Sequence, residues 1–274
     1  MLQKSTMKAK ILLIAAAIQL SNTVCAQDSP YKTDLVVDGF TIGGAVGLNA
    51  LGLSLIQNKS SLSSSELNLK DKQGIFRWER GVAGNYSKQA DKDSYIPFYA
   101  SIAAVPVIVL LNKSERTKAG QILVLFTESM AMTGAVYTLT AGSVNRSRPY
   151  VYNTDLPTDF RADKNAQRSF FAGHTATTAT ATFFAAKVYC DFHTDSKYKA
   201  YVWTAAALVP ATVAYLRVKA GMHFITDNLI GFAVGATSGI LIPELHKGIN
   251  QNRLTLSPVV GVNYKGLNVT YALR

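Results

Sequence analysis

The chain has 274 residues, of which 48% are apolar and only 16% charged, and its formal net charge is +11 at pH 7. A soluble globular domain carries about 25% charged residues, so this composition excludes an intrinsically disordered chain and favours contact with a membrane. The positive balance suits an anionic partner such as phosphate or anionic lipid. The basic residues are spread along the chain, which, together with the export signal described next, argues against a nucleic-acid partner.

The first 26 residues have the three parts of a secretory signal. Three lysines form the positive region, "ILLIAAAI" is a short apolar core, and "VCA" offers a cleavage site before Gln27. We therefore expect residues 1–26 to be a signal peptide and the protein to lie in a bacterial cell envelope. A lipoprotein anchor on Cys25 is an alternative that the preceding "NTV" does not favour. Cleavage leaves Cys190 alone, which excludes an internal disulfide and a cysteine-based zinc site.

Apolar stretches then alternate with polar connections. They cover residues 39–57, 95–112, 121–142, 170–189, 198–218 and 225–245. The last three have about the 20 residues that a membrane-spanning helix needs, and no charge stands at their centres. They are apolar all round, so they are buried or face lipid. The pattern predicts an all-α fold, a bundle of about six mostly membrane-length helices.

The C-terminal segment differs from the rest. "LTLSPVVGVNYKGLNVTYALR" (254–274) alternates apolar and polar residues and is rich in β-branched ones, with "NYKG" at its middle. This pattern predicts a short β-hairpin, with a poorly ordered tail as the alternative. We divide the chain after the signal into three parts: an N-terminal apolar segment with a polar connection (27–94), a helical core (95–250) and a hairpin or tail (251–274).

Polar side chains stand at the ends of the apolar stretches. They come from "NRSRPYVYN", "FFAGHTATTA" and "LRVKAGMHFITDN", and they are Arg146, Arg148, Gly173, His174, Arg217, His223 and Asp227. In a helix, His223 and Asp227 share a face, so the carboxylate can accept a proton from one imidazole nitrogen and leave the other as a nucleophile. His174 is a second imidazole at a helix start, where free backbone N–H groups can bind phosphate. Arg148 and Arg217 can bind phosphate oxygens through two hydrogen bonds each.

Each of these features alone has a structural explanation, such as a basic loop or a buried histidine. Together, residues 141–227 resemble the type 2 phosphatidic acid phosphatase superfamily, which also includes bacterial acid phosphatases and vanadium haloperoxidases. Its motifs K-x6-R-P, P-S-G-H and S-R-x5-H-x3-D correspond to "AGSVNRSRP", "FAGH" and "LRVKAGMHFITD". The resemblance is greatest to bacterial lipid A or undecaprenyl pyrophosphate phosphatases, and it implies a helical-bundle core.

The resemblance also implies a mechanism. His223 would attack phosphorus to form a phosphohistidine, Asp227 would orient it, and His174 would protonate the leaving oxygen. The equatorial phosphate oxygens would be stabilised by Arg148, Arg217 and the backbone N–H of Gly173. No metal or cofactor is implied, because the arginines supply the charge that Mg²⁺ supplies elsewhere.

The chain departs from the motifs at four positions. The family lysine, proline and two serines are replaced by Ala141, Phe171, Ala172 and Leu216. Losing one phosphate donor can lower the rate by about 10²–10³-fold. Arg146 is expected to replace the charge of the lysine. Three alternatives remain: the chain is a slow enzyme, an enzyme with an altered substrate geometry, or a degenerate member of the superfamily. The intact histidines, aspartate and arginines favour activity.

We therefore predict a metal-independent phosphatase that acts on a lipid-linked phosphomonoester or pyrophosphate of the lipid A, undecaprenyl pyrophosphate or phosphatidate class. The alternatives are a soluble periplasmic acid phosphatase on the same fold and a catalytically degenerate membrane protein that binds anionic lipid. Glu128, within the third apolar stretch, is expected to pair with an arginine or a hydroxyl, in a functional or a structural role. The sequence gives no indication of oligomeric state.

The basic link at residues 113–118 predicts a cytoplasmic loop, which places the site on the periplasmic side of the inner membrane. A cleaved signal would leave residue 27 outside, whereas a spanning first stretch would then begin inside. Three solutions remain open: the signal is retained, residues 39–57 do not cross, or the protein does not span the membrane.

Overall fold

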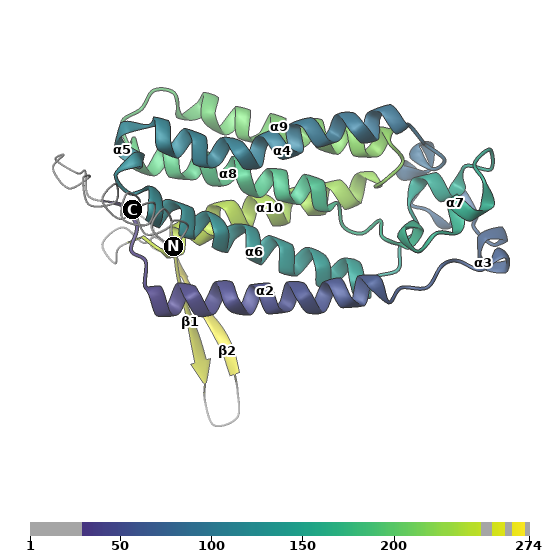
Figure 1. Ribbon diagram of the computed structural model, residues 1–274, viewed down its shortest axis with the longest axis horizontal. Helices are drawn as coiled ribbons and strands as arrows, with labels where there is room; N and C mark the ends of the chain where they lie inside the picture. The colour runs from purple at the N-terminus through teal and green to yellow at the C-terminus, as the bar shows by residue number, and fades with distance from the viewer. Residues whose placement is uncertain (1–28, 248–253, 261–264, 272–274) are drawn as a thin grey trace, which may run out of the picture.

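The computed structural model describes residues 29–247, 254–260 and 265–271 (Figure 1). The predicted signal peptide and Cys25 lie outside these ranges. Within them the long helices are α2 (Leu35–Gln57), α4 (Lys88–Leu111), α6 (Ala119–Ser143), α8 (Gly173–Phe192), α9 (Lys199–Lys219) and α10 (Ile225–Leu245). They coincide with the six predicted apolar stretches, so the all-α class is confirmed. Because the Ser87 hydroxyl accepts a hydrogen bond from Ala90 N, α4 begins in polar sequence before its apolar stretch.

Short elements connect the long helices. They are α3 (Ser64–Asn68), α5 (Lys113–Arg116), α7 (Thr158–Ala162) and the 3₁₀ turns η1 (Lys72–Gly74), η2 (Arg77–Val82), η3 (Pro149–Tyr152) and η4 (Lys164–Gln167). At the C-terminus, β1 (Leu254–Val260) and β2 (Lys265–Tyr271) form an antiparallel pair, in register from Leu254 opposite Tyr271 to Val260 opposite Lys265. The predicted hairpin is therefore confirmed.

Helix α8 runs through the middle of the bundle and packs closely against α10 (Figure 1). The closest approach is at Gly235 of α10, where a Cβ atom would lie 2.0 Å from the carbonyl oxygen of Ala176. Gly231 and Gly239, one turn to either side, face α8 in the same way. Such spacing of small residues lets two membrane helices approach at backbone distance. The two helices that carry the second and third motifs are thus held firmly together.

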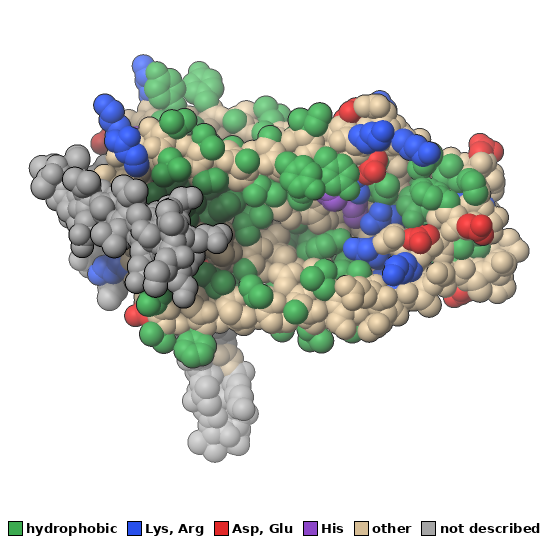
Figure 2. Space-filling model, viewed as in Figure 1, with side chains coloured by type: hydrophobic (Ala, Val, Ile, Leu, Met, Phe, Trp, Pro, Cys, Tyr) green, Lys and Arg blue, Asp and Glu red, His purple; other side chains and the backbone are tan. Residues whose placement is uncertain are grey.

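Five of the long helices are long and apolar enough to cross a membrane: α2, α4, α6, α9 and α10. Large apolar side chains on α2 and α4 are exposed, among them Phe40, Leu51, Ile96 and Leu111, and hydrophobic side chains cover much of the face in Figure 2. These surfaces fit lipid rather than water, so the chain is an integral membrane protein rather than the soluble alternative. Helix α8 has the predicted length but is not among the five, because its threonines make it less apolar; Thr175, Thr178 and Thr180 are buried inside the bundle.

The polar motifs meet at one end of the bundle. Helices α6 and α9 end there, α8 and α10 begin there, and the loops around α7 cover it (Figure 1). The turn between α9 and α10 needs Gly221, whose φ is +75° and where a Cβ atom would lie 1.8 Å from the carbonyl oxygen of Asn85. This turn returns the chain so that Arg217 and His223 lie on the same side.

Candidate active site

Backbone hydrogen bonds hold the three motif segments against one another. Ser169 N donates to the carbonyl oxygen of Arg146 at 3.0 Å, and Ala172 N donates to that of Asp227 at 3.0 Å. Arg146 and Arg168 also form an isolated parallel β-bridge. The side chains of the three motifs therefore project from one connected framework.

His223 is an almost fully buried imidazole, only 2% exposed. Its Nδ1 lies 2.6 Å from the carbonyl oxygen of Ser169. A carbonyl can only accept, so Nδ1 carries the proton and Nε2 keeps its lone pair. Burial, together with the positive charges of Arg148 and Arg217, holds the pKa of His223 well below its usual range. The ring is therefore neutral at physiological pH, with Nε2 available as a nucleophile.

Asp227 acts on this histidine indirectly. Helix α10 begins at Ile225, so His223 lies before the helix and does not share its face with Asp227. Asp227 Oδ2 instead accepts hydrogen bonds from Phe224 N at 2.8 Å and from the Ser169 hydroxyl at 2.5 Å. The direct bond that we predicted between Asp227 and His223 is thus replaced by a link through Ser169, whose hydroxyl binds the acid and whose carbonyl binds the imidazole.

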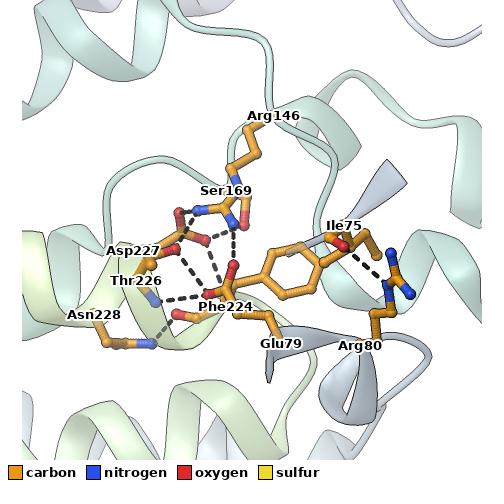
Figure 3. Close-up of polar contacts among 9 residues, drawn as sticks. All are labelled: Ile75, Glu79, Arg80, Arg146, Ser169, Phe224, Thr226, Asp227 and Asn228. Carbon is orange, nitrogen blue, oxygen red and sulfur yellow. Dashed lines mark hydrogen bonds and ion pairs between the residues drawn. The ribbon is translucent and has the colours of Figure 1, made fainter. Parts of the chain in front are cut away.

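The guanidinium of Arg146 is bound by two acids, whereas we expected it to bind phosphate (Figure 3). Its guanidinium pairs with Asp227 and, through Nη2 at 2.7 Å, with Glu79, and it lies 4.8 Å from the centre of the Phe224 ring. Glu79 is 0% exposed and accepts two more hydrogen bonds at 2.8 Å, from the backbone N and the hydroxyl of Thr226. Two carboxylates therefore fix the position of Arg146. We call Glu79, Arg146 and Asp227 together the brace behind His223. Glu79 lies in the polar connection 58–94, and no motif or residue spacing in the sequence indicated that it belongs to the site.

His174, the second residue of α8, supplies the second imidazole. Its ring packs against Tyr95 and Phe98 of α4, with centroid distances of 4.9 and 4.6 Å. The positive charges of Arg148 and Arg217 act on this imidazole as they do on His223. The structure thus brings both histidines and both arginines to one place. In Figure 2, histidine atoms are visible in a depression flanked by basic side chains.

Three arginines in this region have a buried Nε donor that is not used. The Nε atoms of Arg148, Arg168 and Arg217 have no hydrogen-bond acceptor within the described part of the chain. Arg217 is 3% exposed, and its Nη1 is held by Asp91 at the start of α4, at 2.5 Å. The charge of Arg168, which motif reasoning missed, acts on Arg148. Buried donors without acceptors are unfavourable, so this cluster suits an anionic ligand.

The N-terminus of α8 adds backbone donors. Ala172 is the N-cap residue and offers no side-chain cap, which leaves the first N–H groups of the helix without one. At Gly173, a Cβ atom would lie 2.7 Å from the ring of Tyr137, so only glycine fits. The end of a long helix with uncapped N–H groups, beside buried arginines, can bind a phosphate group.

An apolar groove of about 530 Å³ lies between α4, α8 and α9. Pro97 and Ala104 of α4, Ala181 and Ala185 of α8, and Val202 of α9 are among the residues that line it. Its α4 wall begins beside Phe98, which contacts His174. The groove is suited to a hydrocarbon chain whose polar end reaches the histidines.

Residues 122–250 match the family model of the PAP2 superfamily, the type 2 phosphatidic acid phosphatases. This part of the chain therefore matches the PAP2 superfamily, in agreement with the resemblance inferred from the three motifs. The chain is also 30% identical over 83 residues to the lipid A 4'-phosphatase of Porphyromonas gingivalis, a match that covers 30% of this chain and 32% of that relative's length.

Two solved structures have a related arrangement of helices. A transmembrane PAP2-type phosphatidylglycerolphosphate phosphatase from Bacillus subtilis is 17% identical, with a TM-score of 0.42 over 72% of this chain and 93% of that one. LpxE from Aquifex aeolicus is 19% identical, with a TM-score of 0.39 over 60% of this chain and 92% of that one. Both scores are below 0.5, and no conclusion rests on them.

Proposed function

We propose that this protein is a lipid phosphatase that works through a phosphohistidine at His223. The observation that carries the proposal is the state of this imidazole. It is buried and neutral, its Nδ1 proton is bound by the Ser169 carbonyl, and the charges of Arg148 and Arg217 act on it. A neutral nucleophile among buried cations is suited to attack on an anionic phosphate.

In the first step, the lone pair of His223 Nε2 attacks phosphorus. The negative charge of the bound phosphate offsets Arg148 and Arg217, so that His174 can carry a proton in the complex. The N–P bond forms as the P–O bond to the lipid breaks, and His174 donates this proton to the leaving oxygen. In the second step, His174 accepts a proton from water, the water oxygen bonds to phosphorus and the N–P bond breaks. Inorganic phosphate leaves, and both histidines return to their starting states.

Guanidinium groups and backbone N–H groups stabilise the charge on the equatorial oxygens. Arg148, Arg217 and the N–H of Gly173 take this role. Arg168 supplies the third positive charge, in place of the family lysine that is absent at Ala141. We expect Arg168→Gln to lower kcat/KM by about 10-fold or more. Arg116→Gln, at the other end of the bundle, is the control, and equal loss in both variants would exclude this role for Arg168.

The substrate is proposed to be a phosphorylated lipid. The apolar groove beside Phe98 accommodates acyl or prenyl chains while the phosphate lies between the histidines. Lipid A, undecaprenyl pyrophosphate and phosphatidate are the candidate classes, and the lipid A 4'-phosphatase relative favours the first.

The decisive assay is phosphate release by the purified protein in detergent from these three lipids. We expect His223→Ala to lower the rate by about 10³-fold or more. His193→Ala is the matched control, because His193 lies at the far end of the bundle, bonded to Ser114 and Tyr189. Equal rates for the wild-type protein and His223→Ala would refute the proposal that the protein is a phosphatase. They would favour the alternative of a non-catalytic protein that binds anionic lipid. Trapping of labelled phosphate on histidine tests the covalent step.

We further propose that the site faces the periplasm. The site lies at the end of the bundle opposite the start of α2 (Figure 1), so this orientation places Tyr31 in the cytoplasm and requires that the signal be retained. The test uses single cysteines at Ser29 and Asp155 in a background without Cys25 and Cys190. A membrane-impermeant maleimide applied to spheroplasts should label position 155 and not position 29, and the reverse pattern would refute the orientation.

A further inference from the structure

At the end of the bundle away from the proposed phosphatase site, three side chains of the kind that bind metals meet. They are Asp38 of α2, Glu128 of α6 and His246, directly after α10. One ligand atom from each lies within 4.8 Å of the other two. His246 Nε2 is 3.1 Å from Asp38 Oδ1 and 3.5 Å from Glu128 Oε2. We had expected an arginine or a hydroxyl as the partner of Glu128, and His246 takes this place instead.

The other polar atoms of this triad are directed away from its centre. His246 Nδ1 lies 2.8 Å from the carbonyl oxygen of Ile242 and therefore carries a proton, while Nε2 faces the acids and lies within hydrogen-bond distance of Asp38 Oδ1, at 3.1 Å. A metal ion bound to Nε2 would take the place of the proton in that contact. Asp38 Oδ2 accepts a hydrogen bond from Asp34 N at 2.9 Å. A histidine whose outer nitrogen donates to a carbonyl while the inner one faces carboxylates has the usual arrangement of a metal ligand.

Glu128 gives a second indication of a cation site. It is 4% exposed, and its Oε2 has no hydrogen-bond partner within the described residues. Asp38 is equally buried. Two buried carboxylates carry more negative charge than a single imidazole can neutralise, which is unfavourable unless a cation is bound.

Among the residues that the structure describes, the nearby lysines do not supply that charge. Lys187 and Lys247, at the same end of the bundle, pair with Asp191 and Glu244. These four side chains form a separate, balanced network. The triad is thus left with three electron-rich atoms around one small space.

We propose that Asp38, Glu128 and His246 bind one divalent transition-metal ion of the Zn²⁺ class. In a tetrahedral site with bonds of about 2.0–2.1 Å, ligand atoms lie about 3.3–3.4 Å apart. The observed separations of 3.1 and 3.5 Å from Nε2 bracket this value. The imidazole favours Zn²⁺ over Mg²⁺ or Ca²⁺, which prefer oxygen ligands. The ion is structural: it ties the start of α2 to α6 and to the end of α10, and it takes no part in the phosphatase chemistry.

The test measures metal content of the full-length protein in detergent. The protein is stripped with a chelator, loaded with Zn²⁺ alone and freed of excess metal. We expect about one bound Zn²⁺ per chain in the wild type and loss of most of it in Glu128→Gln and His246→Gln. Glu244→Gln, which removes a carboxylate from the neighbouring network, should keep its Zn²⁺. Wild-type protein that holds no Zn²⁺, or variants that hold as much as the wild type, would overturn the proposal and leave a triad that shares only a proton.

A second measurement covers variants that fold poorly. Co²⁺ loaded into the wild type should give the intense visible absorption of a tetrahedral site, and one equivalent of Zn²⁺ should abolish it. Absence of this absorption also contradicts the proposal. Metal content is read without phosphatase activity, so this test and that of the proposed function fail independently.

Discussion

The brace behind His223 yields a quantitative prediction for Glu79→Gln. In the wild type, Glu79 is 0% exposed and accepts hydrogen bonds from Arg146 and twice from Thr226. Glutamine keeps the size but removes the charge and turns an amide NH₂ toward these donors. Breaking a buried ion pair by changing one partner costs about 3–5 kcal/mol. For a chain of this size, such a loss should lower Tm by on the order of 10 °C.

The same change should lower kcat, because Arg146 also holds Asp227, which in turn holds Ser169 and through it His223. Inhibition by vanadate, a phosphate analogue, should change little, since Arg148 and Arg217 are untouched. Thermal unfolding in detergent and steady-state kinetics measure the two effects. Glu66→Gln, on the exposed helix α3, is the control and should leave both unchanged. If Glu79→Gln has a wild-type Tm and kcat, or if it weakens vanadate binding as much as it lowers kcat, the brace does not exist as described.

Three other changes have defined outcomes. The low pKa of His223 keeps Nε2 unprotonated in acid, so kcat/KM should begin to fall only below about pH 6.5. Arg217→Gln removes a positive charge that disfavours the imidazolium, so the pH at which kcat/KM falls should rise. A value that is unchanged or lower in this variant would contradict the reasoning. Ala172→Ser restores a hydroxyl at the start of α8 and should raise kcat, by up to about 10²-fold, whereas an unchanged or lower kcat would mean that the pocket is built around alanine. Gly235→Ala should lower the unfolding free energy by about 1–3 kcal/mol through overpacking against Ala176, while Gly43→Ala, with nothing within 4 Å of its Cβ, should not.

The helices could be predicted from the sequence because each is an apolar run of membrane length between polar segments. The common location of the motifs also followed from the alternation of helix directions. The start of α4 could not be located in this way, since its first turns are polar and depend on the Ser87 cap. Among these turns is Asp91, which holds Arg217 in place.

The motifs located the residues of the site, but spacing along the sequence did not predict the contacts among them. The spacing of His223 and Asp227 is that of one helical face, but the capping of Phe224 N by Asp227 starts the helix after His223 and breaks that relation. The carboxylate of Glu79 reaches Arg146 from a distant 3₁₀ turn, and no periodicity carries that information. Glu128 likewise meets its partner His246 only in the folded bundle.

The polar character of α8 has a consequence for biosynthesis. Two of its threonine hydroxyls bond to helices that follow it in the chain: Thr182 donates to the carbonyl oxygen of Ala206 in α9 at 2.8 Å, and Thr175 donates to Asn228 in α10 at 2.7 Å. Alone in a bilayer, this helix would lack such neighbours and would partition poorly from the translocon into lipid. We therefore expect α8 to insert stably only together with α9 and α10, and a chain that is truncated before these helices should leave α8 accessible to water-soluble reagents.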